Sequence, residues 1–226
     1  MTYEVFKQKV DEFLNFTKAK RIISYRLINY RKNADWLCNV PHRKFLDLAI
    51  VYQASNFIGP MGINTLLIDN DQMNDWDITE PALYRLAKKN MPTLLPVQID
   101  SIDAVINKLE EHCEVSENDR EEIRKKLGML DVPMYMITNT YQTYGAAGIL
   151  YDHVLCDFSM EQGCGLFLLP TSIHEMMIIP DEGIVKVDDL KQMMKDVNRS
   201  LKTEEKVLFL SESVYLYSES NGIQFA

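Results

Sequence analysis

The sequence predicts an α+β protein, a single compact unit over residues 1–226 in which helices pack on a mixed, largely antiparallel sheet. Three observations lead to this class. In the first third of the chain, polar and apolar residues alternate with the period of two that is typical of strands. In the middle, apolar residues recur with the helical period, and in the last third the two patterns alternate. No repeat of fixed period interrupts this order.

The composition is that of a globular domain with a sizeable core. Hydrophobic residues make up 46% and charged residues 25% of the 226 residues, so neither disulfides nor a structural metal are needed for stability. The net charge of −9 argues against a general nucleic-acid binder and against attachment to an anionic membrane. No segment approaches the roughly 20 apolar residues of a membrane span, and residues 1–7 lack the apolar core of a signal peptide. We therefore expect a cytoplasmic protein whose cysteines are thiols.

The first third begins with an amphipathic helix over residues 3–17, whose apolar stripe contains Phe6, Val10, Phe13 and Leu14. We expect this helix to be peripheral. Three strands separated by turn residues follow: residues 22–30, 45–53 and 63–69. Strands joined in succession by short connections favour an antiparallel meander.

The middle of the chain is predicted to be helical. One helix has Thr79 as its N-cap, and Asn90 and Pro92 end it. Two more show the same period: residues 102–109 and the segment from Ser116 to the stop at Gly128. The segment 71–131 is the only candidate domain boundary, but it contains no flexible linker, so we expect one continuous domain.

The last third alternates strands with helices. The predicted strands are residues 134–138, 146–151, 166–169 and 173–179, with a final strand or hairpin over residues 207–217. One helix runs from a cap at Asp152 to Gly163, and another follows a cap at Asp188. The tail, residues 218–226, is polar, and we expect it to be frayed and peripheral.

Motifs for phosphate binding and serine hydrolysis are absent from the sequence: it has no Gly-x-x-x-x-Gly-Lys-Ser/Thr, no Gly-x-Gly-x-x-Gly between strand and helix, and no Gly-x-Ser-x-Gly. His153, Cys156, Cys164 and His174 lie within 22 residues, but a zinc site wants two close pairs, and nine residues separate the last two. Cys164 and His174 as nucleophile and base have no evident third group to orient them. We expect core packing for the thiols, no metal and no cofactor.

Polar residues set among apolar ones near strand ends are the candidate binding residues: Arg26, Asn29, His42, Arg43, His174 and Glu175. An imidazole and a carboxylate at such a place can perform acid–base chemistry. The alternative is a satisfied network that fixes the strand ends, with Arg43 bound to Glu175 or Asp47 and His42 donating to a backbone carbonyl. We favour the network and assign no catalytic residue, because nothing in the sequence marks a substrate pocket.

These polar stretches also resemble a known family. The shared motifs are Arg26-Leu27-Ile28-Asn29, Pro41-His42-Arg43, Leu83-Tyr84-x-Leu86-Ala87-x-x-Asn90, Ile137-Thr138-Asn139, Gly145-Ala146-Ala147, Pro170-Thr171-Ser172-Ile173-His174-Glu175 and Val197-Asn198. Together they resemble an uncharacterised domain-of-unknown-function family of anaerobic Gram-positive gut bacteria, over about residues 22–217. The resemblance implies a bacterial cytoplasmic protein and supplies no activity, cofactor or partner.

The charge is divided unevenly along the chain: residues 1–50 carry a net +5 and the remainder −14. The basic part either packs against the acidic segment 100–122 or binds an anion. Our leading hypothesis is a non-enzymatic interaction or ligand-sensing domain, whose partner is an unidentified protein, a second copy of the chain included, or a small anionic ligand. The alternatives are a hydrolase-like or other acid–base enzyme using His42, His174 and Glu175, and an assembly protein with a contact surface of methionines: Met176, Met177, Met193 and Met194.

Overall fold

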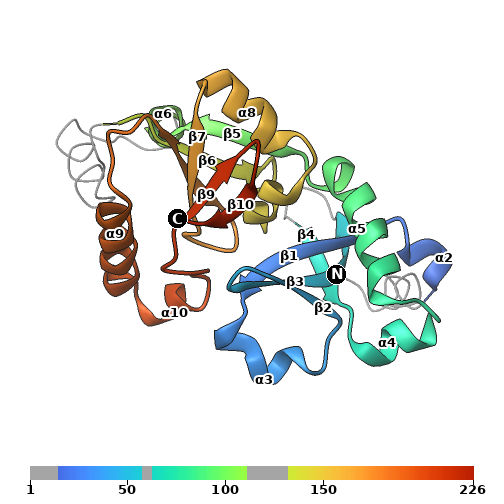
Figure 1. The fold of residues 1–226 in the computed structure, drawn as a ribbon. Helices are drawn as coiled ribbons and strands as arrows, with labels where there is room; N and C mark the ends of the chain where they lie inside the picture. Colours follow the sequence, from blue (N-terminus) through green and yellow to red (C-terminus); the bar gives the residue numbers. More distant parts are fainter. Residues whose placement is uncertain (1–14, 58–62, 111–131) are drawn as a thin grey trace. The chain divides into compact units, whose positions relative to one another are not determined.

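The computed structural model describes residues 15–57, 63–110 and 132–226 (Figure 1). The chain groups into two compact units, residues 1–97 (unit 1) and residues 98–226 (unit 2), and each is described by itself. Each unit contains an antiparallel sheet with helices, so the α+β class is confirmed. The boundary lies inside the segment 71–131 that the sequence offered. The single domain over residues 1–226 stays a prediction, because one domain can contain two such units.

Unit 1 is built on a four-stranded antiparallel sheet in the order β1-β3-β2, with β4 also pairing with β3. Its strands are β1 (Ile23–Asn29), β2 (His42–Phe45), β3 (Leu48–Phe57) and β4 (Ile63–Leu67). Its helices are α2 (Phe16–Ala19), a 3₁₀ helix (Arg31–Asn33), α3 (Ala34–Leu37), α4 (Asn70–Asp75) and α5 (Glu80–Leu94). Because β3 is long, β2 and β4 share one of its edges, at opposite ends.

Helix α5 packs on one face of this sheet. Tyr25 pairs with Tyr52 across β1 and β3, so both side chains share a face, and the Tyr25 ring stacks on Tyr84 of α5 at 6.1 Å. The Asn90 side chain of α5 donates to the carbonyl of Ile23 at 2.9 Å. The opposite face carries a second apolar cluster of buried residues: Ile28, Leu37, Val40, Ala49 and Val51. Unit 1 therefore has apolar layers on both sides of its sheet.

Two predictions for unit 1 are wrong in their boundaries. The strand predicted over residues 45–53 is a hairpin, because Leu46 and Asp47 form the turn between β2 and β3, and Leu46 adopts a φ of 54°. Because the alternation of apolar and polar residues continues through so short a turn, the sequence pattern does not reveal the turn. Helix α5 continues past Asn90 and through Pro92, since a proline in the last turn removes only one hydrogen bond near the end of the helix.

Unit 2 contains a six-stranded sheet in the order β10-β9-β7-β8-β6-β5. Its strands are β5 (Val97–Ser101), which starts at the unit boundary, β6 (Tyr135–Asn139), β7 (Gly165–Leu169), β8 (Met176–Asp181), β9 (Tyr215–Ser218) and β10 (Gly222–Phe225). Its helices are α6 (Ile102–Glu110), a 3₁₀ helix (Gly145–Leu150), α8 (Val154–Gln162), α9 (Val187–Ser200) and α10 (Thr203–Lys206). The described residues thus form two sheets where the sequence suggested one.

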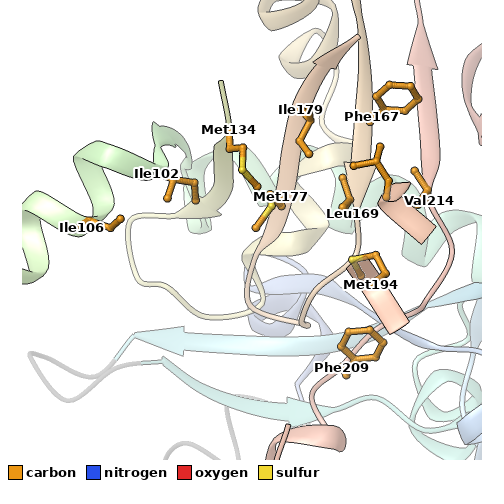
Figure 2. Packing of buried hydrophobic residues seen from close by; sticks show 11 residues of the cluster. Ile102, Ile106, Met134, Phe167, Leu169, Met177, Ile179, Met194, Phe209 and Val214 are labelled. Carbon is orange, nitrogen blue, oxygen red and sulfur yellow. The ribbon is translucent and has the colours of Figure 1, made fainter. Parts of the chain in front are cut away.

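The alternation of side chains along β7 and β8 separates the two faces of the unit 2 sheet. One face forms the apolar cluster of Figure 2, with Phe167 and Leu169 from β7, Met177 and Ile179 from β8, and Met194 from α9. Helix α8 packs on the opposite face, where the rings of Phe158 and of Tyr135 on β6 lie edge to face with their centres 5.0 Å apart. Helices therefore cover both faces of this sheet.

The structure also corrects predictions for unit 2. Residues 146–151 were expected to be a strand, but Gly145–Leu150 is a 3₁₀ helix. Gly145 lies so close to its neighbours that a Cβ there would stand 2.6 Å from the carbonyl oxygen of His174. The tail is not frayed, because Gly222–Phe225 pairs with β9 and the Phe225 ring packs against Tyr215. The prediction failed because a short edge strand needs few apolar residues.

The final strand or hairpin predicted over residues 207–217 is wrong in its bounds, because β9 begins only at Tyr215. Most of the helix predicted over residues 3–17, and the helix predicted from Ser116 to Gly128, lie outside the described residues. Helices α8 and α9 are confirmed, although their N-caps are His153 and Lys186. Within the described ranges, no helix is both long and apolar enough to cross a membrane.

Candidate functional site

Arg43 lies in a group of four side chains in unit 1, which we call the unit 1 polar cluster: Arg43 of β2, Tyr52 of β3, and Glu80 and Tyr84 of α5. The guanidinium makes a bidentate ion pair with the Glu80 carboxylate, with Nε donating to Oε1 at 3.1 Å and Nη2 donating to Oε2 at 2.9 Å. The guanidinium carbon also lies 4.2 Å from the centre of the Tyr84 ring, a cation–π contact. The cluster therefore ties β2 to the first turns of α5.

The Tyr52 hydroxyl donates a further hydrogen bond to Glu80 Oε1. Burial acts to raise the pKa of Glu80, but the bonds from Arg43 and Tyr52 outweigh it and hold the pKa below its usual value. Burial, together with the bond to Glu80, raises the pKa of Tyr52. The bond to Glu80 raises the pKa of Arg43 as well. At neutral pH the cation of Arg43, the anion of Glu80 and the neutral phenol of Tyr52 thus satisfy each other.

Asn29 and His42, two other candidate residues of unit 1, fix local backbone. The Asn29 side chain accepts from the amide of Lys32 at 2.7 Å, and its carbonyl accepts from the Asn33 side chain at 2.8 Å. Nδ1 of His42 lies 3.0 Å from the carbonyl oxygen of Val40. Because a carbonyl oxygen can only accept, Nδ1 must carry the hydrogen. The expectation that His42 donates to a backbone carbonyl is therefore confirmed.

The network expected around Arg43 forms with a different carboxylate. Its partner is Glu80, rather than Asp47 or Glu175. Arg26 lies half-buried in the middle of β1. An anion site in the basic first 50 residues stays a prediction. Of the N–H donors of Arg43, such a site could use only those that are not bound to Glu80.

Unit 2 contains a pocket of about 320 Å³, at the small end of the range for ligand sites. It lies between α9 and the sheet face that carries the apolar cluster, next to the segment that joins β7 to β8. We call it the unit 2 pocket, and it is lined by Met136, Thr171, Ser172, His174, Glu175, Met177, Met193, Met194, Val197, Leu201, Glu205 and Leu208. Four of these residues are methionines, and the polar ones come mainly from the β7–β8 connection.

Glu175 is held in place by a tight turn that begins at Ser172. The Ser172 hydroxyl donates to Glu175 Oε1 at 2.6 Å and accepts from the amides of His174 and Glu175 at 2.9 and 3.3 Å. A hydroxyl has one hydrogen to donate and two lone pairs, so its capacity is used. The Thr171 hydroxyl donates to the carbonyl of Glu175 at 3.2 Å. Both hydroxyls are thereby committed to the turn.

His174, the other candidate residue of this pocket, is fixed from the side of the 3₁₀ helix. The amide of Tyr144 donates to its Nδ1 at 3.2 Å, and the Tyr144 ring stacks on the imidazole at 5.7 Å. The Thr138 hydroxyl donates to the His174 carbonyl at 2.9 Å. Because Nδ1 accepts a hydrogen bond, the neutral ring carries its hydrogen on Nε2. His174 thus presents a ring N–H donor.

The structure brings the candidate residues together in two pairs. His42 and Arg43 are neighbours on β2 of unit 1, and His174 and Glu175 both line the unit 2 pocket. The methionine contact surface proposed from the sequence does not form as such, because Met176 is fully buried. Its three other members, Met177, Met193 and Met194, line the pocket instead.

In the part of the chain that the structure describes, neither a metal site nor an activated cysteine is found. There, no three His, Cys, Asp or Glu side chains come close enough together to hold a metal ion. Burial raises the pKa of the Cys164 thiol, whereas a cysteine nucleophile needs a lowered one.

The sequence did not reveal the partners of Arg43 in the unit 1 polar cluster, nor the existence of the unit 2 pocket. Glu80 is 37 residues from Arg43, and its only signal is that of an acidic residue in the first turn of a helix. Tyr52 reads as a core residue. For the pocket, the helical spacing of Met193, Met194 and Val197 predicts a buried stripe, and only the tertiary packing shows that the stripe is incompletely covered.

Comparison with protein families identifies one whose model matches residues 2–219, and its description reads "Family of unknown function (DUF5688)". Searches of the curated proteins and of the solved structures find no match to the chain. The expectation of an uncharacterised family is therefore confirmed, while the gut-bacterial source stays a prediction.

Proposed function

The chain belongs to this family of unknown function, and because the family description names no activity, we propose from the unit 2 pocket that the protein is a non-enzymatic ligand-binding domain. In this proposal the pocket takes up a small, largely apolar molecule. The observation that carries it is a pocket of about 320 Å³ whose apolar wall is joined on one side to fixed polar groups.

The state of the polar groups supports binding over catalysis. A serine nucleophile needs a free hydroxyl and a base, but the Ser172 hydroxyl is fully used within its turn. The imidazole of His174 accepts a backbone amide at Nδ1, where a catalytic histidine usually donates to an orienting carboxylate. Groups held in this way can orient a ligand without reacting with it.

The second candidate function is an acid–base enzyme. One observation favours it, since His174 and Glu175, an imidazole and a carboxylate, both line the same pocket. Replacement of His174 by Gln separates the two functions. An acid–base enzyme would lose its turnover with this variant, whereas a binding domain would keep its affinity for an apolar ligand within a few-fold.

The binding proposal is tested by NMR of the intact chain with methyl-labelled methionine, titrated with 2-phenylethanol. We expect the methyl signals of the four pocket methionines, Met136, Met177, Met193 and Met194, to move with one common dissociation constant. Met91, buried in unit 1, and Met160, exposed on α8, serve as controls that should stay in place. Equal movement of all methyl signals, or movement of none, would contradict the proposal.

We also propose the bacterial cytoplasm as the place of action. The cysteines that the structure describes, Cys38, Cys156 and Cys164, are free thiols, which supports a reducing compartment. Labelling with a thiol reagent directly after cell lysis should find all of them accessible after denaturation, and a disulfide would contradict the proposal.

A further inference from the structure

We propose that the ligand of the unit 2 pocket carries an ammonium group on its apolar body and that Glu175 binds this group. The inference rests on the proposed function, because it specifies the chemistry of the molecule that the same pocket takes up. It is carried by three observations: the hydrogen-bond inventory of the polar side, the charge of the lining and the nature of the apolar wall.

The polar side of the pocket has spare acceptors and almost no spare donors. The hydroxyl hydrogens of Thr171 and Ser172 are both used within the turn, on the carbonyl and the carboxylate of Glu175. Glu175 Oε2 takes no hydrogen bond from the described residues, and Oε1 has room for another. The ring N–H of His174 is the donor that remains. A ligand that brings several N–H donors of its own matches this inventory.

The charge of the lining points the same way. Two carboxylates, Glu175 and Glu205, line the pocket, and no lysine or arginine is among its described lining residues. Glu205 Oε2 accepts from the amide of Lys202, which holds this second carboxylate beside the pocket. A cation entering here is attracted by both carboxylates, whereas an anion is repelled. Glu175 is half-buried, so its field is screened less than that of an exposed side chain.

The apolar wall limits the rest of the ligand. Methionine side chains are flexible and polarisable, and they pack well against aromatic rings. Counted at the roughly 30 Å³ that one water occupies, the pocket of about 320 Å³ holds about ten non-hydrogen atoms. An arylalkylamine such as phenethylamine has this size and combines an aromatic ring with an ammonium group.

Calorimetric titration of the full-length chain with three matched compounds tests the proposal: phenethylamine, 2-phenylethanol and phenylacetate. We expect the amine to bind about tenfold more tightly than the alcohol, because a hydrogen bond to a charged group adds that much, and the acid to bind most weakly. If the alcohol or the acid binds as tightly as the amine, the ammonium inference is overturned and the binding function stands. If none of the three binds, both fail.

Two variants make the test residue-specific. Glu175→Gln removes the charge but keeps an oxygen that accepts from Ser172, so the turn should persist, as circular dichroism can verify. This variant should bind the amine about tenfold more weakly and the alcohol as before. Glu182→Gln, an exposed position in the turn after β8, is the matched control and should leave both affinities unchanged. An unchanged amine affinity in Glu175→Gln would overturn the role of this carboxylate.

Discussion

The unit 1 polar cluster and the unit 2 pocket each contain a half-buried glutamate, Glu80 and Glu175, with opposite effect. In the cluster, the Glu80 carboxylate accepts three hydrogen bonds, from Arg43 and Tyr52, and each partner lies on a different element. In the pocket, the Glu175 carboxylate accepts one hydrogen bond from the described residues, donated by Ser172 of the turn that holds it. A saturated carboxylate joins elements together, whereas an unsaturated one beside an apolar cavity has capacity left for a ligand. Hydrogen-bond saturation therefore distinguishes the two sites better than residue type does.

The largest expected effect concerns the backbone that positions His174. In Gly145→Ala, the new Cβ would collide with the Thr138 hydroxyl and would stand 2.6 Å from the His174 carbonyl oxygen, and backbone cannot move aside as the end of a side chain can. We expect the free energy of unfolding to fall by about 3 kcal/mol, with loss of amine binding. Urea unfolding followed by circular dichroism measures the first effect and calorimetry the second.

A glycine with open surroundings is the control for this variant. Gly163 ends α8 with a φ of 72°, and a Cβ added there would meet no neighbouring atom within 4 Å. Gly163→Ala should cost only about 1 kcal/mol, the strain of a left-handed alanine, and should keep amine binding. Equal losses in the two variants would show that crowding at Gly145 is not what fixes the pocket.

The second effect tests whether the unit 1 polar cluster is structural. Glu80→Gln leaves Arg43 without its counter-ion, and we expect a loss of about 2 kcal/mol in the free energy of unfolding. Both tryptophans of the chain, Trp36 and Trp76, belong to unit 1, so their fluorescence in urea follows this loss. Asp196→Asn, which breaks the exposed pair with Arg199 in unit 2, is the control; followed by circular dichroism, it should cost less than about 0.5 kcal/mol.

The third effect is a pH dependence of the same cluster. The pKa of Glu80 is lowered by folding, so its contribution is complete above the ordinary pKa of a glutamate and is lost as the pH falls through the lower, folded-state value. The pKa of Tyr52 is raised, so its contribution is complete below the ordinary pKa of a tyrosine and declines at higher pH. Urea midpoints from acid to alkaline pH should therefore fall at both ends.

Comparison with Glu80→Gln isolates this dependence. The variant lacks the titrating carboxylate, so its acid-side decline in the urea midpoint should be shallower than that of the wild type. Parallel acid-side curves for the two proteins would show that other carboxylates, and not Glu80, cause the decline.

The smallest effect on stability should come from filling the pocket. Val197 lies on α9 and is partly buried against the cavity. In Val197→Phe the larger ring occupies space that a ligand would use, so we expect the free energy of unfolding to change by no more than about 0.5 kcal/mol. The affinity for phenethylamine should fall about tenfold or more. A large loss of stability would mean that the cavity has no room for the added ring.

Local patterns predict much of this fold. The alternation in Ile23–Asn29 and the apolar stripe of α9 give the correct elements because each depends on neighbours in sequence. The hairpin turn at Leu46 and Asp47 was missed because the alternation continues across it. The 3₁₀ helix at Gly145–Leu150 was missed because the periodicity of so short an apolar run does not distinguish a helix from a strand. Boundaries fail where two local structures share one pattern.

For the candidate sites, too, the sequence predicted what depends on local pattern and missed what depends on packing. His42, Arg43, His174 and Glu175 were identified from their places beside strands, and all four take part in specific contacts. The ion-pair partner of Arg43 was not identified, because Glu80 lies far from it in sequence, and the pocket beside His174 and Glu175 was not identified either. A pairing over 37 residues, or a cavity between a helix and a sheet, is decided by packing and leaves no local signal.

The most direct test of the difference between the two sites is the urea midpoint of three proteins, wild type, Glu80→Gln and Glu175→Gln, measured by circular dichroism with and without saturating phenethylamine. A ligand that binds only the native state raises the midpoint. We predict that Glu80→Gln lowers the midpoint and keeps the increase caused by the amine, whereas Glu175→Gln keeps the midpoint and shows a clearly smaller increase, because it binds the amine about tenfold more weakly. The opposite assignment of the two effects, or both effects in one variant, would contradict the account.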